Sequence, residues 1–260
     1  MPYTRFVALG DSQTEGLGDP DPRFEYRGWA DRLAEMIAVH SPGLHYANLA
    51  VRGKTTREAL DEQLAPAIGM RPDLVAAPVG MNDVIGSADM GRVSDDLETL
   101  FGRLTDTGAT VLTCTFPNLA RTIPMGGLFE DRLLQINDLM RGFAERFGLV
   151  LVDLHSAPVL VDPRSWSQDR LHASPFGHSR FAEAAAHALN LPGSSDAWTA
   201  PLAPLPEKPR LARHAGDARW AVQFLTPWLI RKARGVSMGD GRAPKRPTLA
   251  PVTAPGLTVR

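Results

Sequence analysis

The stretch RFVALGDSQTEG, residues 5–16, joins a short apolar run to a polar turn that contains glycine at both ends. An uninterrupted apolar run such as Phe6–Leu9 is typical of a strand that is buried on both faces of a sheet. The turn that follows places Ser12 at the carboxyl end of this strand. The stretch therefore predicts the first strand of an α/β fold, with a serine at the edge where the strand ends.

Similar apolar runs recur through the first 190 residues, at Leu44–Leu49, Leu74–Val79, Thr110–Phe116 and Leu149–Leu154. Strands that alternate with helical segments form βαβ units, and these units build a parallel sheet that is covered on both faces. We predict an α/β fold of the flavodoxin-like type, a three-layer α/β/α sandwich with a five-stranded parallel sheet. Binding and catalytic residues in such folds lie beyond the carboxyl ends of the strands.

The segments between these runs carry apolar residues at spacings of three and four, as on one face of a helix. Clear examples span residues 29–37, 93–104 and 133–147. Ser94 can cap the second example and Gly108 can end it, whereas Gly148 ends the third.

The character of the chain changes near residue 192. We predict one α/β domain over residues 1–192 and a helical C-terminal extension over residues 193–260. The extension begins as a proline-rich linker, continues as an amphipathic basic helix over residues 211–234, and ends in an irregular tail from residue 239. Pro227 should kink or split this helix near Thr226.

The extension is basic, with 11 Lys and Arg against 4 Asp and Glu, a balance of +7 that leaves −8 for residues 1–192. Three interpretations stay open for the helix. Its apolar stripe packs on the body, or it forms a contact in an oligomer of unknown size. In the third, Trp220, Trp228 and the basic run 231–234 make a weak contact with an anionic membrane surface.

The remaining composition restricts the class of protein. The 260 residues are 43% hydrophobic and 22% charged, which indicates an ordinary globular protein. The formal net charge of −1 at pH 7 gives no indication of a nucleic-acid partner. Cys114 is the single cysteine, which excludes an internal disulfide, and we expect it to be buried and inert. No signal peptide or membrane span is visible, so a cytoplasmic location is expected.

Two short blocks suggest nucleophilic catalysis. A serine hydroxyl becomes a good nucleophile only when a base removes its proton, and histidine titrates in the useful range. The block 169–172, Asp-Arg-Leu-His, supplies both His172 and a carboxylate, Asp169, that can fix the tautomer of its imidazole. Ser12 would be the nucleophile of such an arrangement.

Two further blocks follow predicted strands and so lie at the same sheet edge as Ser12. Gly53 ends the block 48–53, and Asn82 lies in the block 80–83, Gly-Met-Asn-Asp. A glycine N–H and a side-chain amide are common donors to an oxyanion. Glycine suits position 53 because the backbone there must approach the substrate closely.

These four blocks, in this order, resemble those of the SGNH hydrolases, also called GDSL-type esterases and lipases. The resemblance covers about residues 5–190, with Gln13 at a position where the family often has leucine. It implies the flavodoxin-like fold, with Ser12 as nucleophile, His172 as general base and Asp169 as its support. The N–H groups of Ser12 and Gly53 and the side chain of Asn82 would form the oxyanion hole.

Neighbouring residues receive structural interpretations. Asp11 and Asp83 are expected to order loops through hydrogen bonds, and His178 to be structural. Glu15 and Arg52 lie beside the site, where contact with substrate is an open alternative. The other histidines show no metal-binding spacing. The segment 235–239, Gly-Val-Ser-Met-Gly, matches the elbow motif of α/β-hydrolases, but no strand precedes it and no histidine follows, so we interpret it as a loop.

The sequence therefore predicts a serine esterase that cleaves an acyl ester through an acyl-serine intermediate, without cofactor or metal. Small-molecule, lipid and carbohydrate esters all remain open as substrates. The alternatives are acyl transfer by the same residues and a non-catalytic binding module on the same fold. We expect the loops Leu17–Tyr26 and Leu119–Leu128 to shape the substrate pocket.

Overall fold

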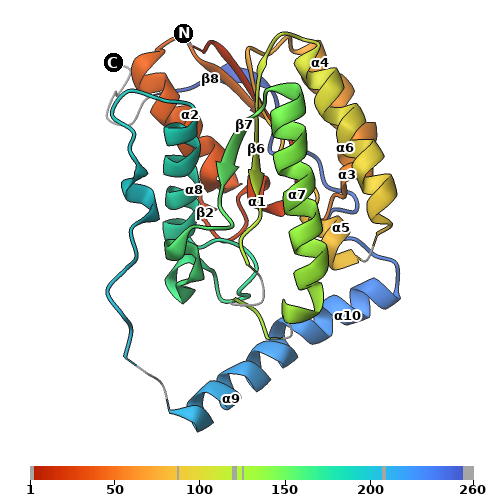
Figure 1. Ribbon diagram of the computed structural model, residues 1–260, viewed down its shortest axis with the longest axis vertical. Helices are drawn as coiled ribbons and strands as arrows, with labels where there is room; N and C mark the ends of the chain where they lie inside the picture. The colour runs from red at the N-terminus through yellow and green to blue at the C-terminus, as the bar shows by residue number, and fades with distance from the viewer. Residues whose placement is uncertain (1–2, 87, 119–121, 125, 207–208, 254–260) are drawn as a thin grey trace.

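The computed structural model describes residues 3–86, 88–118, 122–124, 126–206 and 209–253. Its centre is a six-stranded sheet in the spatial order β7-β6-β5-β1-β4-β8, with helices on both faces (Figure 1). The strands are β1 Arg5–Ala8, β4 His45–Asn48, β5 Leu74–Ala76, β6 Thr110–Thr115, β7 Val150–Asp153 and β8 Arg246–Pro251. A separate antiparallel ribbon pairs β2, Pro20–Asp21, with β3, Glu25–Tyr26.

The five predicted strands are confirmed as β1, β4, β5, β6 and β7, and every pairing among them is parallel. The chain passes from β1 to β4 on one side, and then crosses to the other side of β1 to form β5. The loops after β1 and β5 therefore diverge, which makes this point the switch in strand order where α/β sheets open a site. The three-layer prediction holds, with one strand added.

The added strand is β8, which pairs antiparallel with β4 at the edge of the sheet. The prediction of an irregular tail is therefore wrong for Arg246–Pro251. Two prolines, Pro247 and Pro251, hide this strand in the sequence. An edge strand tolerates them because only one of its sides must supply hydrogen bonds to the sheet.

Helices cover both faces of the sheet. α2 and α8 pack against each other on one face, while α3, α6 and α7 lie on the other (Figure 1). Their bounds are α1 Ser12–Glu15, α2 Gly28–His40, α3 Thr56–Glu62, α4 Leu64–Gly69, α5 Met81–Gly86, α6 Met90–Thr105, α7 Glu130–Phe147 and α8 Pro175–Ala188. α6 begins four residues before Ser94 because Asp89 supplies its N-cap. Gly148 ends α7 in the left-handed conformation, as expected.

The extension forms α9, Arg210–Trp220, a π-helical turn at Ala221–Leu225, and α10, Thr226–Ala233. The irregular turn ends at Leu225, next to Thr226, where the break was expected. The predicted packing of the apolar stripe is wrong, since Leu211 is 81% and Val222 is 71% exposed. The membrane and oligomer interpretations stay predictions. In the parts of the chain that the structure describes, no helix has the length and apolar character needed to span a bilayer.

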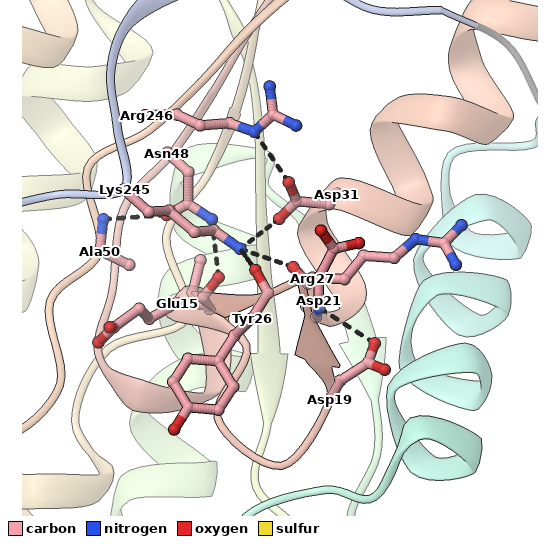
Figure 2. A network of polar contacts seen from close by, with 12 residues as sticks. Glu15, Asp19, Asp21, Tyr26, Arg27, Asp31, Asn48, Ala50, Lys245 and Arg246 are labelled. Atoms are coloured by element: carbon pink, nitrogen blue, oxygen red, sulfur yellow. Dashed lines mark hydrogen bonds and ion pairs between the residues drawn. The ribbon is translucent and has the colours of Figure 1, made fainter. Parts of the chain in front are cut away.

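A buried cluster of charges fixes the tail to the body (Figure 2). The ammonium group of Lys245 donates to the carbonyl oxygens of Tyr26, at 3.1 Å, and Arg27, at 2.6 Å, and to the carboxylate of Asp31, at 2.5 Å. Arg246 donates from Nε to the other oxygen of Asp31, at 2.9 Å. Burial raises the pKa of Asp31 and lowers that of Lys245, so both charges depend on this pairing.

Candidate active site

The nucleophile candidate lies in the first turn of α1, immediately beyond β1. The backbone of Gly10 is held by both ends of one buried amide, since its N–H donates to Gln63 Oε1 at 2.8 Å and its carbonyl accepts from Gln63 Nε2 at 2.9 Å. Asp11 caps the helix by accepting from the N–H of Gln13 at 3.0 Å. Ser12 is thus held on a short, anchored turn.

Ser12, His172 and Asp169 form a continuous chain of hydrogen bonds. Ser12 Oγ lies 2.8 Å from His172 Nε2, and His172 Nδ1 lies 2.6 Å from Asp169 Oδ2. An ionised carboxylate can only accept, so Nδ1 carries the proton and Nε2 is left to accept from the serine hydroxyl. Both Ser12 and His172 are buried. The arrangement can therefore move a proton from the hydroxyl to the imidazole.

The loop that carries the histidine is ordered around the carboxylate of Asp169. Its Oδ1 accepts from Ser167 Oγ at 2.7 Å and from the N–H groups of Leu171, at 3.0 Å, and His172, at 2.9 Å. Burial alone would raise the pKa of Asp169, but the hydrogen bonds with His172 bring it well below its ordinary value. Arg170, between the two, has a φ of 60°, a conformation that residues with a side chain rarely adopt.

Gln13 is a site residue that the sequence analysis did not identify. Its side-chain amide donates to the carbonyl oxygen of Leu171 at 2.9 Å, and its Oε1 accepts from the N–H of Ala173 at 3.2 Å. These two residues flank His172 on either side. The residue after Ser12 therefore fixes the histidine loop to α1, and the only sequence signal was a polar residue at a commonly apolar position.

Gly53 lies in a turn that is held by a buried ion pair. Arg52 donates from Nε to Glu15 Oε1 at 3.0 Å, and its backbone N–H donates to Glu15 Oε2 at 2.7 Å. The N–H of Val51 also donates to the carbonyl of Gly10 at 3.3 Å. Glu15 and Arg52, for which substrate contact was an open alternative, are thus committed to ordering this turn.

Asn82 connects its own block to the two that contain Asp11 and Gly53. Its Nδ2 lies 3.2 Å from Asp11 Oδ2 and 2.9 Å from the carbonyl oxygen of Lys54, the residue after Gly53. Each amide hydrogen thus has an acceptor within the protein, and an oxyanion would compete with Asp11 for one of them. Asp83 accepts from the N–H of Thr56, at 2.8 Å, and orders the start of α3.

The buried carboxyl of Asp11 titrates far above its ordinary range. Burial raises its pKa to about 6, and the hydrogen bond from the N–H of Gln13 opposes this shift. Asp11 is therefore mostly ionised at neutral pH and accepts from Asn82, and it loses that charge in mild acid. This agrees with the expectation that it orders the loops rather than reacting.

The remaining expectations concern single residues. His178 is fully buried, accepts from the N–H of Trp29 at 3.1 Å and lies 2.9 Å from the carbonyl of Leu17, so it is structural, and burial lowers its pKa to about 4. Cys114 is buried and its pKa is raised to about 12. Ser237 lies in a loop, as expected. Within the described ranges, no three His, Cys, Asp or Glu side chains gather as a metal site.

An apolar cavity of about 50 Å³ lies beside the motif. Asp11 and Gln13, the residues on either side of Ser12, contribute to its wall, together with core side chains from the sheet and α8. The loop Leu17–Tyr26, expected to shape the pocket, contributes nothing to this wall. The stretch Leu119–Leu128 lies partly outside the described residues.

Comparisons with known proteins identify the family of the chain. The sequence model of the GDSL-like lipase/acylhydrolase family matches residues 8–180. An arylesterase of Vibrio mimicus is 23% identical over 188 residues, which are 71% of this chain and 88% of that protein. The match to the family model ends before the extension begins.

Two solved structures illustrate the likeness of fold. An α/β hydrolase, LAE5, from the metagenome of Lake Arreo, Spain, has a TM-score of 0.59 and 24% identity over 72% of this chain and 95% of its own. An acetylxylan esterase from Geobacillus stearothermophilus has a TM-score of 0.60 and 18% identity over 72% of this chain and 94% of its own.

Proposed function

Because the chain belongs to the GDSL-like lipase/acylhydrolase family and is a hydrolase, we propose that it cleaves carboxylic esters through an acyl-serine intermediate on Ser12. The observation that carries this proposal is the continuous hydrogen-bond chain from Ser12 Oγ through His172 to Asp169, with contacts of 2.8 Å and 2.6 Å. A hydroxyl, an imidazole and a carboxylate in this order are the parts that acyl transfer to a serine requires.

In the first half of the reaction, Ser12 Oγ attacks the ester carbonyl while its proton passes to His172 Nε2. The proton on Nδ1 stays against Asp169, whose negative charge stabilises the imidazolium that forms. His172 then donates the proton to the leaving alkoxide, and the acyl-serine remains. In the second half, His172 removes a proton from water, the hydroxide attacks the acyl carbon, and Ser12 recovers its proton as the acid leaves.

The negative charge on the carbonyl oxygen would be held by the N–H groups of Ser12 and Gly53 and by the amide of Asn82. Donors of this kind contribute about 2.7–4 kcal/mol each to the transition state. Asn82 can contribute because its 3.2 Å contact with Asp11 is the longer of its two hydrogen bonds, so the hydrogen on that side is the one an oxyanion would share.

We further propose a short acyl chain for the substrate. Support comes from the cavity of about 50 Å³, which is lined in part by Asp11 and Gln13, the neighbours of Ser12 in the chain, and has room for only a few carbon atoms. The relatives include an arylesterase and an acetylxylan esterase. The p-nitrophenyl esters of acetate, butyrate and octanoate test this, and kcat/KM should fall at least about 10-fold from butyrate to octanoate. A preference for octanoate would contradict the short-chain proposal and leave the mechanism intact.

The mechanism is tested by substitution and by covalent labelling. Ser12→Ala and His172→Ala should each lower kcat on p-nitrophenyl acetate by at least about 1000-fold, because they act as one unit. The exposed histidine in α8 offers a matched control, and His187→Ala should keep wild-type rates. A fluorophosphonate probe should label wild type and fail to label Ser12→Ala. Full activity of Ser12→Ala would overturn the proposed function.

A further inference from the structure

The C-terminal extension contacts both loops of the candidate active site. α9 and α10 lie across the end of the molecule toward which β6 and β7 point (Figure 1), the edge where Ser12 and His172 meet. One part of the extension reaches the histidine loop, and another reaches the turn that carries Gly53. The family match ends at residue 180, so these contacts are made by residues outside it.

On the histidine side, the contacts hold a turn of unusual conformation. Trp220, which is buried, donates from Nε1 to the carbonyl oxygen of Asp169 at 2.7 Å. Asp217 accepts from Arg170 at 2.6 Å, and the Arg170 guanidinium lies 5.8 Å from the centre of the Trp220 ring. Arg170 is the residue with the φ of 60° between Asp169 and His172. Such a conformation persists only where surrounding contacts enforce it.

On the other side, the extension presses on the peptide that contains the Gly53 N–H. Gly239 is buried, and a Cβ at this position would lie closer than 3.0 Å to the carbonyl oxygen of Arg52. That oxygen and the N–H of Gly53 belong to one planar peptide unit, so a shift of the oxygen also moves the N–H. A Cβ on Gly53 would in turn lie 2.5 Å from Ser237 Oγ. The two segments are therefore in close backbone contact.

The segment around Gly239 has little freedom to withdraw. Ser237 and Asp240 close a turn, with the Ser237 N–H 2.9 Å from Asp240 Oδ2, and the N–H of Arg242 donates to the Gly239 carbonyl at 3.0 Å. A few residues later, Lys245 enters the buried cluster on Asp31 (Figure 2). Because the chain is fixed on this side, a larger residue at position 239 must displace Arg52 and its peptide.

We propose that the extension positions the two halves of the active site, with Gly239 setting the Arg52–Gly53 peptide and Trp220 setting the turn at Asp169. Both are positioning residues, since they act through other groups and touch no reacting atom. The inference rests on the proposed function, in which Gly53 N–H and His172 act on the same carbonyl group. It assigns a catalytic contribution to a segment that the family match does not include.

Gly239→Ala is the direct test, because Gly239 has no positive φ and alanine there conflicts only with its neighbours. We expect kcat on p-nitrophenyl acetate to fall about 10- to 100-fold with KM changed less than about three-fold, since a displaced donor costs at most what a lost one costs. The labelling rate of Ser12 should fall in the same proportion. Gly216→Ala is the matched control, since a Cβ there meets nothing closer than 3.9 Å. It should keep wild-type kcat.

Trp220→Phe tests the contact with the histidine loop, and it keeps the proposal testable if Gly239→Ala does not fold. The phenyl ring keeps part of the packing and removes the N–H donor to Asp169, so we expect kcat to fall about three- to ten-fold at unchanged KM. A purely structural role would lower the melting temperature and leave kcat of the folded enzyme at 25 °C unaltered. Rates within two-fold of wild type in both variants would overturn the proposal.

The two proposals fail in different ways. If wild type hydrolyses no ester and Ser12 is not labelled, the proposed function fails, and this inference falls with it. If wild type is active and loses activity in Ser12→Ala, while Gly239→Ala and Trp220→Phe behave like wild type, only the role of the extension is refuted.

Discussion

Replacing Lys245 by methionine removes the cation that fixes the C-terminal tail to the body of the protein. The ammonium group has three acceptors, the carbonyl oxygens of Tyr26 and Arg27 and the carboxylate of Asp31, and its side chain is only 8% exposed. Methionine has a similar length and fills most of the same space. The substitution therefore deletes the charge and its hydrogen bonds without leaving a large cavity.

The magnitude follows from what Lys245→Met leaves behind. Asp31 keeps Arg246 at 2.9 Å but remains a buried carboxylate with half of its compensation gone. Breaking one partner out of a buried ion pair typically costs about 3–5 kcal/mol. We expect the lower end, about 3 kcal/mol, because the raised pKa of Asp31 allows it to take up a proton. For a chain of this size, that corresponds to a decrease in melting temperature of about 6–12 °C.

Chemical denaturation at pH 7, followed by tryptophan fluorescence, measures the change in the free energy of unfolding. Arg23→Met is the matched control, because it removes a cation from an ion pair with Asp21 in which the Arg23 side chain is 66% exposed. Such exposed pairs contribute less than about 1 kcal/mol. If Lys245→Met costs no more than Arg23→Met, the tail is not anchored by this cluster and the reasoning is refuted.

Three further predictions concern the active site and its surroundings. Asp169→Asn should lower kcat about 10- to 1000-fold, because an amide can present the wrong partner to Nδ1. The loss should be smaller than in His172→Ala, and equal losses would contradict this. Gln13→Leu should lower kcat about 10-fold at constant KM and cost about 1–3 kcal/mol of stability, as two hydrogen bonds around the histidine disappear; unchanged kcat would refute it. The pKa of His178 is about 4 in the folded protein, below the ordinary value of 6.5 that applies to the unfolded chain. As the pH falls from 7 to 4, the unfolded chain therefore binds a proton at His178 before the folded protein does. Wild type should therefore lose about 3 kcal/mol relative to His178→Gln between pH 7 and pH 4, and a constant stability difference in denaturation curves would exclude this. Asp11, whose pKa is raised to about 6, contributes in the opposite direction over the same range, so only the comparison of the two proteins isolates His178.

Local pattern was enough to predict the central sheet. The five parallel strands are short apolar runs, and in a parallel sheet the ends of such runs share one edge. Ser12 and Asn82 follow neighbouring strands there, so their proximity followed from topology. His172 lies in a longer loop after β7, and its place depended on the resemblance to the family as well as on the residues themselves.

The extension could not be predicted in the same way, because its structure depends on contacts with distant residues. The pairing of Lys245 with Asp31 spans 214 residues, and nothing local at either position indicates it. Pro247 and Pro251 argue against a strand unless an edge position is known in advance. The apolar periodicity of α9 and α10 was real, but it does not specify which surface, if any, covers it.

One short helix contacts the other three blocks of the site and positions them relative to one another. α1 is only four residues long, yet its cap and three of its side chains together reach the other three blocks. Asp11 accepts from Asn82, Ser12 meets His172, Gln13 holds the residues on both sides of that histidine, and Glu15 holds Arg52. Successive side chains of a helix point about 100° apart, so neighbours in one turn face different segments. The turn that bears Ser12 therefore also sets its distance to His172 and to the segments that carry Gly53 and Asn82. This explains why Asp11 and Glu15 are buried and Gln13 is half-buried beside Ser12, where apolar side chains would pack but would not orient the loops.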